Sequence, residues 1–82
     1  MNVSQLEQEL KQLGVPQWMY FLEHDGLPNE AYCLAKKESW EVYYSERGRK
    51  FDLQCFSTET EACEYLLKKL RKYGTVKALN GK

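Results

Sequence analysis

Apolar and polar residues alternate along residues 32–56, and a period of two is typical of strands that bury one face. Turn-forming residues divide this segment at Lys37-Glu38-Ser39 and at Arg47-Gly48. With these turns the apolar residues face one another in pairs: Tyr32 with Tyr44, Leu34 with Val42, Tyr44 with Phe51, Val42 with Leu53, and Trp40 with Cys55. A shift of one residue would turn a strand's apolar set toward solvent. The pattern therefore predicts a three-stranded antiparallel sheet.

The opposite face of this sheet is expected to be solvated and mostly polar. It would carry Cys33, Ala35, Glu41, Tyr43, Ser45, Asp52, Gln54 and, at the end of the last strand, Phe56. In the predicted register Glu41 faces Gln54 and Tyr43 faces Asp52, so Tyr43 would be the one prominent aromatic side chain on that face. Cys55 and Cys63 are expected in the core, and Cys33 on the opposite face.

Helices are predicted on both sides of the strands. Ser4 and Glu7 match a capping box before an apolar stripe, which predicts a helix from about Gln5 to Leu13 that ends at Gly14. Thr58 and Glu61 match a second capping box. The helix after it carries another apolar stripe, and we expect it to end at Gly74, with residues 75–82 frayed.

Residues 15–30 leave two interpretations open. The apolar run from Trp18 to Leu22 is compatible with a short buried strand or with a helical turn, because periodicity does not separate these. His24 to Asn29 has the composition of a loop.

The element order is thus α-β-β-β-α, within a single domain of 82 residues whose ordered core spans about 4–74. Each helix has one apolar stripe and the sheet has one apolar face. The expected architecture is an α+β two-layer sandwich with both helices on one face of the sheet.

Charge and cysteine usage exclude several classes of protein. The formal net charge is zero, so no general affinity for nucleic acid or membranes is implied, although residues 1–30 are acidic and residues 57–82 basic. Three cysteines without close pairs argue against a disulfide framework, and no zinc spacing is present. With no leader or membrane-spanning pattern, we expect a cytoplasmic protein.

No residue pattern indicates catalysis. Glu41 and Asp52 would be neighbouring carboxylates, but an exposed sheet face offers no burial to separate their pKa values. His24 has no nucleophile nearby in the sequence, and no cation near Cys33 would lower the pKa of its thiol. There is no glycine-rich phosphate loop. We therefore expect no enzymatic activity, cofactor or metal.

Two alternatives stay open beside a protein-binding role. Double-stranded RNA-binding domains have the same α-β-β-β-α order, but they begin their second helix with lysines that bind phosphate. Here that place reads Ser57-Thr58-Glu59-Thr60-Glu61, which would repel phosphate. A structural or oligomerising role is the second alternative, because an uncovered sheet edge can pair with another copy.

The predicted hairpin tip at Glu46-Arg47-Gly48 belongs to a longer recurrent pattern, W-x-V-Y-Y-x-E-R-G from Trp40 to Gly48, followed by F-x-T-x-x-x-A-C from Phe56 to Cys63. Together with Leu27-Pro28-Asn29-Glu30-Ala31-Tyr32, this pattern resembles small bacterial immunity proteins found beside polymorphic or contact-dependent toxins. The resemblance implies a non-enzymatic inhibitor that binds a cognate toxin domain.

The resemblance also directs attention to surface residues that a toxin would contact. Aromatic anchors and surrounding charges are typical of such interfaces. The expected anchors are Tyr43, and Trp18 or Tyr20. The expected charged contacts are Glu41, Asp52, Glu46 and Arg47. A secondary acidic segment comprises Glu23, Asp25 and Glu30, which could mimic phosphates if the toxin acts on nucleic acid.

Overall fold

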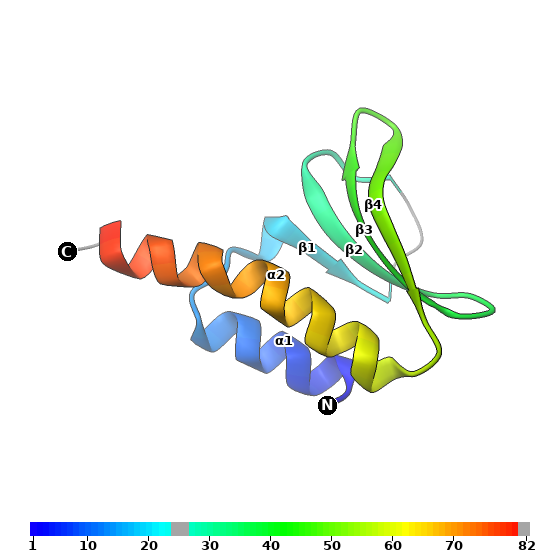
Figure 1. Cartoon of the computed structure of the whole chain (residues 1–82). Coiled ribbons are helices and arrows are strands. Elements are labelled where there is room, and N and C mark those ends of the chain that lie inside the picture. The colour runs from blue at the N-terminus through cyan, green and yellow to red at the C-terminus, as the bar shows by residue number, and fades with distance from the viewer. Residues whose placement is uncertain (24–26, 81–82) are drawn as a thin grey trace.

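The computed structural model describes residues 1–23 and 27–80, and shows an α+β fold with a four-stranded sheet. The elements are α1 (Val3–Gln12), η1 (Gln17–Met19, a 3-10 helix), β1 (Tyr20–Leu22), β2 (Ala31–Lys36), β3 (Trp40–Glu46), β4 (Arg49–Phe56) and α2 (Glu59–Asn80). The sheet order is β1-β2-β3-β4 (Figure 1). The prediction of three strands was therefore wrong, while the α+β class is confirmed.

The additional strand comes from the apolar run that the sequence left undecided. Residues 17–19 form one 3-10 turn, and Tyr20–Leu22 then pairs in parallel with β2, placing Tyr20 opposite Tyr32. A strand of three residues is too short to show a period of two, which is why the pattern did not separate it from a helical turn. The α-β-β-β-α order, on which the comparison with RNA-binding domains rested, is interrupted by this strand.

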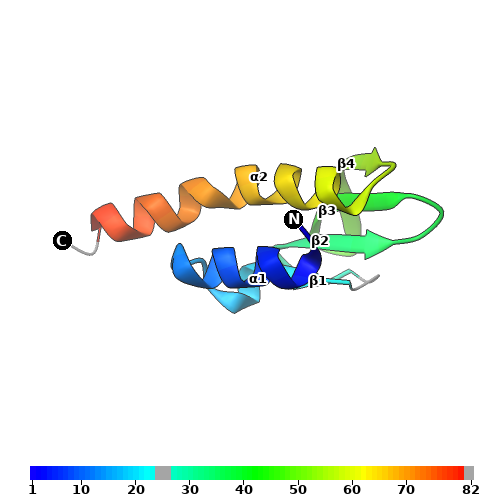
Figure 2. The same ribbon diagram turned by 90° about the horizontal axis from the view of Figure 1, so that it is seen from below.

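The two helices lie side by side and run in the same direction, with their N-terminal ends adjacent (Figures 1 and 2). One core joins them to the sheet. It contains Leu6 and Leu10 from α1, Leu34 and Val42 from the strands, and, from α2, Ala62, Cys63, Leu66, Leu67 and Leu70. The apolar stripes expected for both helices are therefore buried together against β2 and β3.

The first helix begins earlier than predicted. Asn2 is the N-cap and forms a capping box with Gln5, whose backbone N–H donates to Asn2 Oδ1 over 2.8 Å. The predicted box of Ser4 and Glu7 was wrong, because Asn2 caps the chain one half-turn before Ser4. At the other end Gly14, with a φ of +81°, confirms the predicted cap, and Val15 N–H donates to the carbonyl of Leu10.

The second helix confirms the predicted start but not the predicted end. Glu61 N–H donates to Thr58 Oγ1 over 3.2 Å, as expected for an N-cap. Glu59 Oε2 accepts a hydrogen bond from the backbone N–H of Val3 over 2.8 Å, so one side chain of α2 satisfies a donor in the first turn of α1. The helix continues through Gly74 to Asn80, since a single glycine weakens a helix without ending it.

The predicted register is confirmed for β2 and β3, including the pairs Leu34 with Val42 and Tyr32 with Tyr44. Between β3 and β4 it holds only near the turn, where Tyr44 faces Phe51. A β-bulge then shifts β4 by one residue, so that Val42 faces Gln54 and Trp40 faces Phe56. The predicted pairs Val42 with Leu53 and Trp40 with Cys55 were wrong.

Beyond the bulge the two faces of β4 are exchanged. Phe56 packs beside the core, with its ring centroid 5.1 Å from that of Tyr65 on α2. Cys55 is exposed rather than buried, and Leu53 is 44% exposed. Asp52 lies at the shift and has a φ of +54°, a left-handed conformation that is rare for a residue with a side chain.

The sheet face away from the helices is not the solvated face that the sequence predicted. Cys33, Ala35 and Tyr43 form a second buried cluster there, and Ser45 beside them is also buried. The alternation correctly placed these residues on the reverse face. The alternation alone does not predict their burial, and Lys50 of β4 is one group that lies over this cluster.

Candidate protein-binding surface

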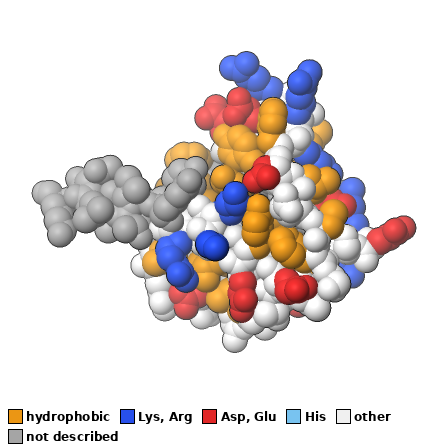
Figure 3. Space-filling view, viewed as in Figure 1, with side chains coloured by type: hydrophobic (Ala, Val, Ile, Leu, Met, Phe, Trp, Pro, Cys, Tyr) orange, Lys and Arg blue, Asp and Glu red, His pale blue; other side chains and the backbone are white. Residues whose placement is uncertain are grey.

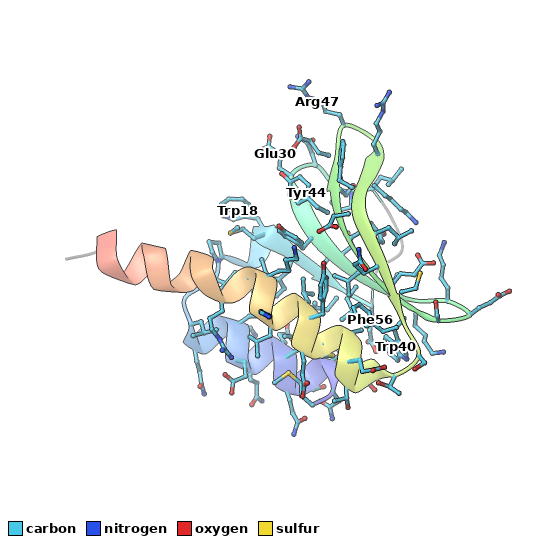
Figure 4. The ribbon with its side chains drawn as sticks, viewed as in Figure 1. Trp18, Glu30, Trp40, Tyr44, Arg47 and Phe56 are labelled. Carbon is cyan, nitrogen blue, oxygen red and sulfur yellow. The ribbon has the colours of Figure 1, made fainter. Side chains whose placement is uncertain are left out.

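The tip of the β3–β4 hairpin is at Arg47-Gly48, as predicted, and projects from one end of the sheet (Figure 4). Arg47 and Gly48 have φ values of +52° and +74°, the pattern of a tight type I′ turn. Arg47 N–H donates to Asn29 Oδ1 over 3.2 Å, which joins the tip to the segment before β2. The tip is therefore held in place by a second part of the chain.

At this tip the Arg47 side chain is open to solvent, and that of Glu46 is partly exposed. The Arg47 side chain is 88% exposed, and its Nε lies 3.8 Å from Glu46 Oε2. Glu30 follows Asn29 and is also exposed, and Figure 4 shows it at the same end of the sheet as Arg47. The structure thus brings together three predicted contact residues, Glu30, Glu46 and Arg47, from two segments.

Next to the tip, three aromatic side chains cross the helix-facing side of the sheet. Tyr32, Tyr44 and Phe51 lie on β2, β3 and β4, and their neighbouring ring centroids are 5.1 and 6.5 Å apart. This end of the sheet extends beyond α2 (Figure 1), and hydrophobic side chains gather there in the space-filling view (Figure 3). Phe51 is 44% exposed, and the two tyrosines are half-buried.

Trp18 extends this row toward β1. Because Tyr20 pairs with Tyr32 in parallel, Trp18 lies at the end of the sheet where β2 begins. Trp18 is 66% exposed, and Figure 4 shows it on the same side of the sheet as Tyr44. We call Trp18, Tyr32, Tyr44 and Phe51 the aromatic platform. Trp18 was an expected anchor, whereas the exposure of Phe51 was missed, because a full apolar face predicts burial along its whole length.

Tyr43 does not provide the exposed anchor that the sequence predicted. It is 1% exposed, and Lys50 Nζ lies 4.5 Å from the centroid of its ring. The same ammonium lies 3.8 Å from Glu41 Oε1, and the Glu41 side chain is 17% exposed. Glu41, Tyr43 and Lys50 therefore form an internal cluster on the reverse face, in which a cation covers the aromatic ring.

Asp52 is also held by the protein itself. Lys69 Nζ donates to Asp52 Oδ2 over 3.2 Å, and the Tyr65 hydroxyl donates to the same oxygen over 3.4 Å. The hydrogen bond and the charge of Lys69 lower the pKa of the Asp52 carboxyl. The Asp52 carboxylate thus lies against α2 while Tyr43 is buried, so the predicted grouping of Glu41, Tyr43 and Asp52 on one open face was wrong.

The predicted acidic segment is divided between two places. Glu30 lies near the hairpin tip, while Glu23 lines a groove beside α1, and both are exposed with positive φ values. Asp25 lies outside the described residues. Tyr20, the other expected anchor, is buried in the core with 6% exposure.

Other chemistry is limited in the described part of the chain. Residues 1–23 and 27–80 contain no group of three histidine, cysteine or acidic side chains placed to hold a metal ion. Burial raises the pKa of the Cys63 thiol to about 11. Within the same residues, no helix has the length and apolar character needed to cross a membrane.

Comparison of this chain with protein-family models, with curated proteins and with solved structures finds no match. Its function is therefore argued from the surface itself.

Proposed function

We propose that this chain is a non-enzymatic protein-binding module that binds and neutralises a bacterial toxin domain, as its resemblance to immunity proteins implies. The observation that carries the proposal is the aromatic platform, in which Trp18 and Phe51 are exposed and Tyr32 and Tyr44 half-buried, at an end of the sheet that α2 leaves uncovered. Aromatic side chains that are exposed in the free protein and surrounded by charges are typical of binding hot spots.

The position of the platform favours tight binding for a second reason. Tyr32, Tyr44 and Phe51 are held on paired strands, and the hairpin tip is fixed by the bond from Arg47 N–H to Asn29. A surface that is ordered before binding loses less conformational entropy when a partner docks. The charged residues Glu30, Glu46 and Arg47 at its border would contribute orientation and association rate more than affinity.

The structure also divides the pattern that carries the family resemblance. Trp40, Val42 and Tyr43 are buried or half-buried within the fold, and their part of the pattern reflects packing. Tyr44 belongs to the platform, and Glu46 and Arg47 form its charged border. These last residues are the ones in which the resemblance and the exposed surface coincide, and they support the proposal together.

The test is growth rescue by co-expression with a toxin domain captured from the host of this protein or encoded beside it. Rescue by the wild-type chain is expected, and failure with every captured or neighbouring toxin would contradict the proposal. The platform is tested with Phe51→Ala and the matched control Leu53→Ala. Both residues lie on β4 with the same exposure, 44%, but on opposite sides of the bulge. Only Phe51→Ala should weaken rescue.

A further inference from the structure

A groove with a volume of about 410 Å³ lies between α1 and β1. Val3, Ser4 and Glu7 of α1 form one wall. The other lining residues come from η1, β1 and the position after it: Gln17, Tyr20, Phe21, Leu22 and Glu23. The groove shares no lining residue with the aromatic platform, so it is a separate feature of the surface.

Tyr20 is the unusual residue among those that line this groove. Tyr20 is 6% exposed, and its hydroxyl oxygen is fully buried without a hydrogen-bond partner among the residues that the structure describes. Buried hydroxyl groups in folded proteins nearly always have a partner, because burial without one opposes folding. A phenylalanine would fill the same space without this penalty, so packing alone does not explain a tyrosine at this position.

Among the described residues, the two charged ones that line the groove are both acidic. Glu7 lies close enough to Tyr20 that its charge, after the larger effect of burial, raises the pKa of the hydroxyl. Glu23 lies at the end of β1 and is exposed. Lys11 is the nearest competitor for Glu7, with Nζ 3.8 Å from Oε2, but both side chains are about half exposed and such a pair is readily exchanged.

The start of α1 does not turn this groove into an anion site. Backbone N–H groups at a helix start attract anions when they are free. Here Val3 N–H donates to Glu59 and Gln5 N–H donates to Asn2. With these two donors occupied, the groove presents the carboxylates of Glu7 and Glu23 and is lined by Val3, Phe21 and Leu22, while the Tyr20 hydroxyl stays buried.

We propose that this groove binds a basic side chain, an arginine or a lysine, of the protein partner. The carboxylates of Glu7 and Glu23 would accept hydrogen bonds from the cation. The Tyr20 oxygen would accept another once the side chains above it give way. Val3, Phe21 and Leu22 in the lining offer apolar contacts to the methylene stem that arginine and lysine carry behind the charge. The proposal rests on the protein-binding function above. It adds a second contact with the same partner and states the kind of side chain that makes it.

A short peptide tests the groove without any toxin. We would titrate the labelled protein with Ac-Gly-Arg-Gly-NH2 and follow its backbone amides by NMR. The matched control peptide carries citrulline, which has the shape of arginine without its charge. Shifts centred on residues 3–7 and 17–23, with an affinity in the order of millimolar, are expected for the arginine peptide. Equal shifts with both peptides, or shifts located elsewhere, would overturn the proposal.

Variants separate binding from folding. Tyr20→Phe should keep or raise the midpoint of thermal unfolding, since it removes an unpaired hydroxyl. It should lower the affinity for the arginine peptide about threefold to tenfold. Glu7→Gln should weaken binding of the arginine peptide about threefold. Glu9→Gln should leave binding unchanged, because Glu9 is exposed on the same helix and does not line this groove. Unchanged affinity in both Tyr20→Phe and Glu7→Gln would show that the groove is not the site. Failure of growth rescue would instead concern the toxin partner and leave the peptide result standing.

Discussion

The ammonium of Lys69 on α2 lies 3.2 Å from Oδ2 of Asp52 on β4 and donates a hydrogen bond to it. Asp52 is also the residue at which β4 changes register, with a φ of +54°. The bond therefore joins the bulge of the edge strand to the helix. The same change of register brings the ring of Phe56 against that of Tyr65. As a result α2 and β4 contact each other at two points along this edge of the sheet.

Lys69→Met should raise the pKa of the Asp52 carboxyl toward its ordinary value, because the hydrogen bond from Lys69 is the main cause of its lowering. A carboxyl whose pKa is lowered by folding stabilises the fold above its unfolded pKa, and this contribution is lost as the pH falls through the folded pKa. The contribution to the free energy of unfolding should be small, since both side chains are substantially exposed. An NMR titration of the carboxyl carbon measures the shift, and Lys68→Met is the control. If the Asp52 carboxyl had the same pKa in Lys69→Met as in the wild type, the hydrogen bond from Lys69 would be contradicted.

Arg47→Asn should stabilise the free protein and weaken the proposed partner contact. Arg47 has a φ of +52°, and asparagine adopts this left-handed conformation more readily than arginine. We expect the free energy of unfolding to rise by about 0.5–1 kcal/mol. Urea denaturation measures it. Arg49→Asn, which removes the same charge from an exposed position in β4, should give no increase. A lower urea midpoint for Arg47→Asn would argue against strain at the turn.

Alanine should have opposite effects at two glycines. Gly14 has a φ of +81°, and none of the described atoms lies within 4 Å of an added Cβ, so Gly14→Ala should cost about 1 kcal/mol through backbone strain. Gly74 lies inside α2, where alanine favours the helix by up to about 1 kcal/mol. Thermal unfolding should show a lower midpoint for Gly14→Ala, and circular dichroism more helix for Gly74→Ala. A loss of helix in Gly74→Ala would place the end of α2 before residue 74.

Much of the sheet could be predicted because its first hairpin follows an uninterrupted alternation. Leu34, Val42 and Tyr44 each have an apolar partner in a single register, and the turn residues agree with it. The bulge could not be predicted in this way. Both registers of β4 bury apolar groups, either Leu53 and Cys55 or Phe56, and the choice depends on contacts with α2 that are distant in the sequence.

The candidate surface was predictable where it depends on local conformation. Arg47-Gly48 is a turn sequence, so the exposure of Glu46 and Arg47 follows from the hairpin itself. The burial of Tyr43 was not predictable, because the alternation indicates only which face a residue lies on; the ammonium of Lys50, 4.5 Å from the ring centroid, is one group that covers the ring. The exposure of Phe51 was likewise missed, since it depends on how far α2 extends across the sheet (Figure 1).

Thiol labelling tests the shifted register directly. Cys55 is exposed, whereas Cys33 and Cys63 are fully buried, and burial raises the pKa of Cys63 to about 11, so that little of it is thiolate at pH 8. An aromatic disulfide reagent should therefore react rapidly with one thiol in the native protein and with all three in urea. Cys55→Ser should remove the rapid phase. A native protein with three slow thiols would mean that Cys55 faces the core, as in the register without the bulge.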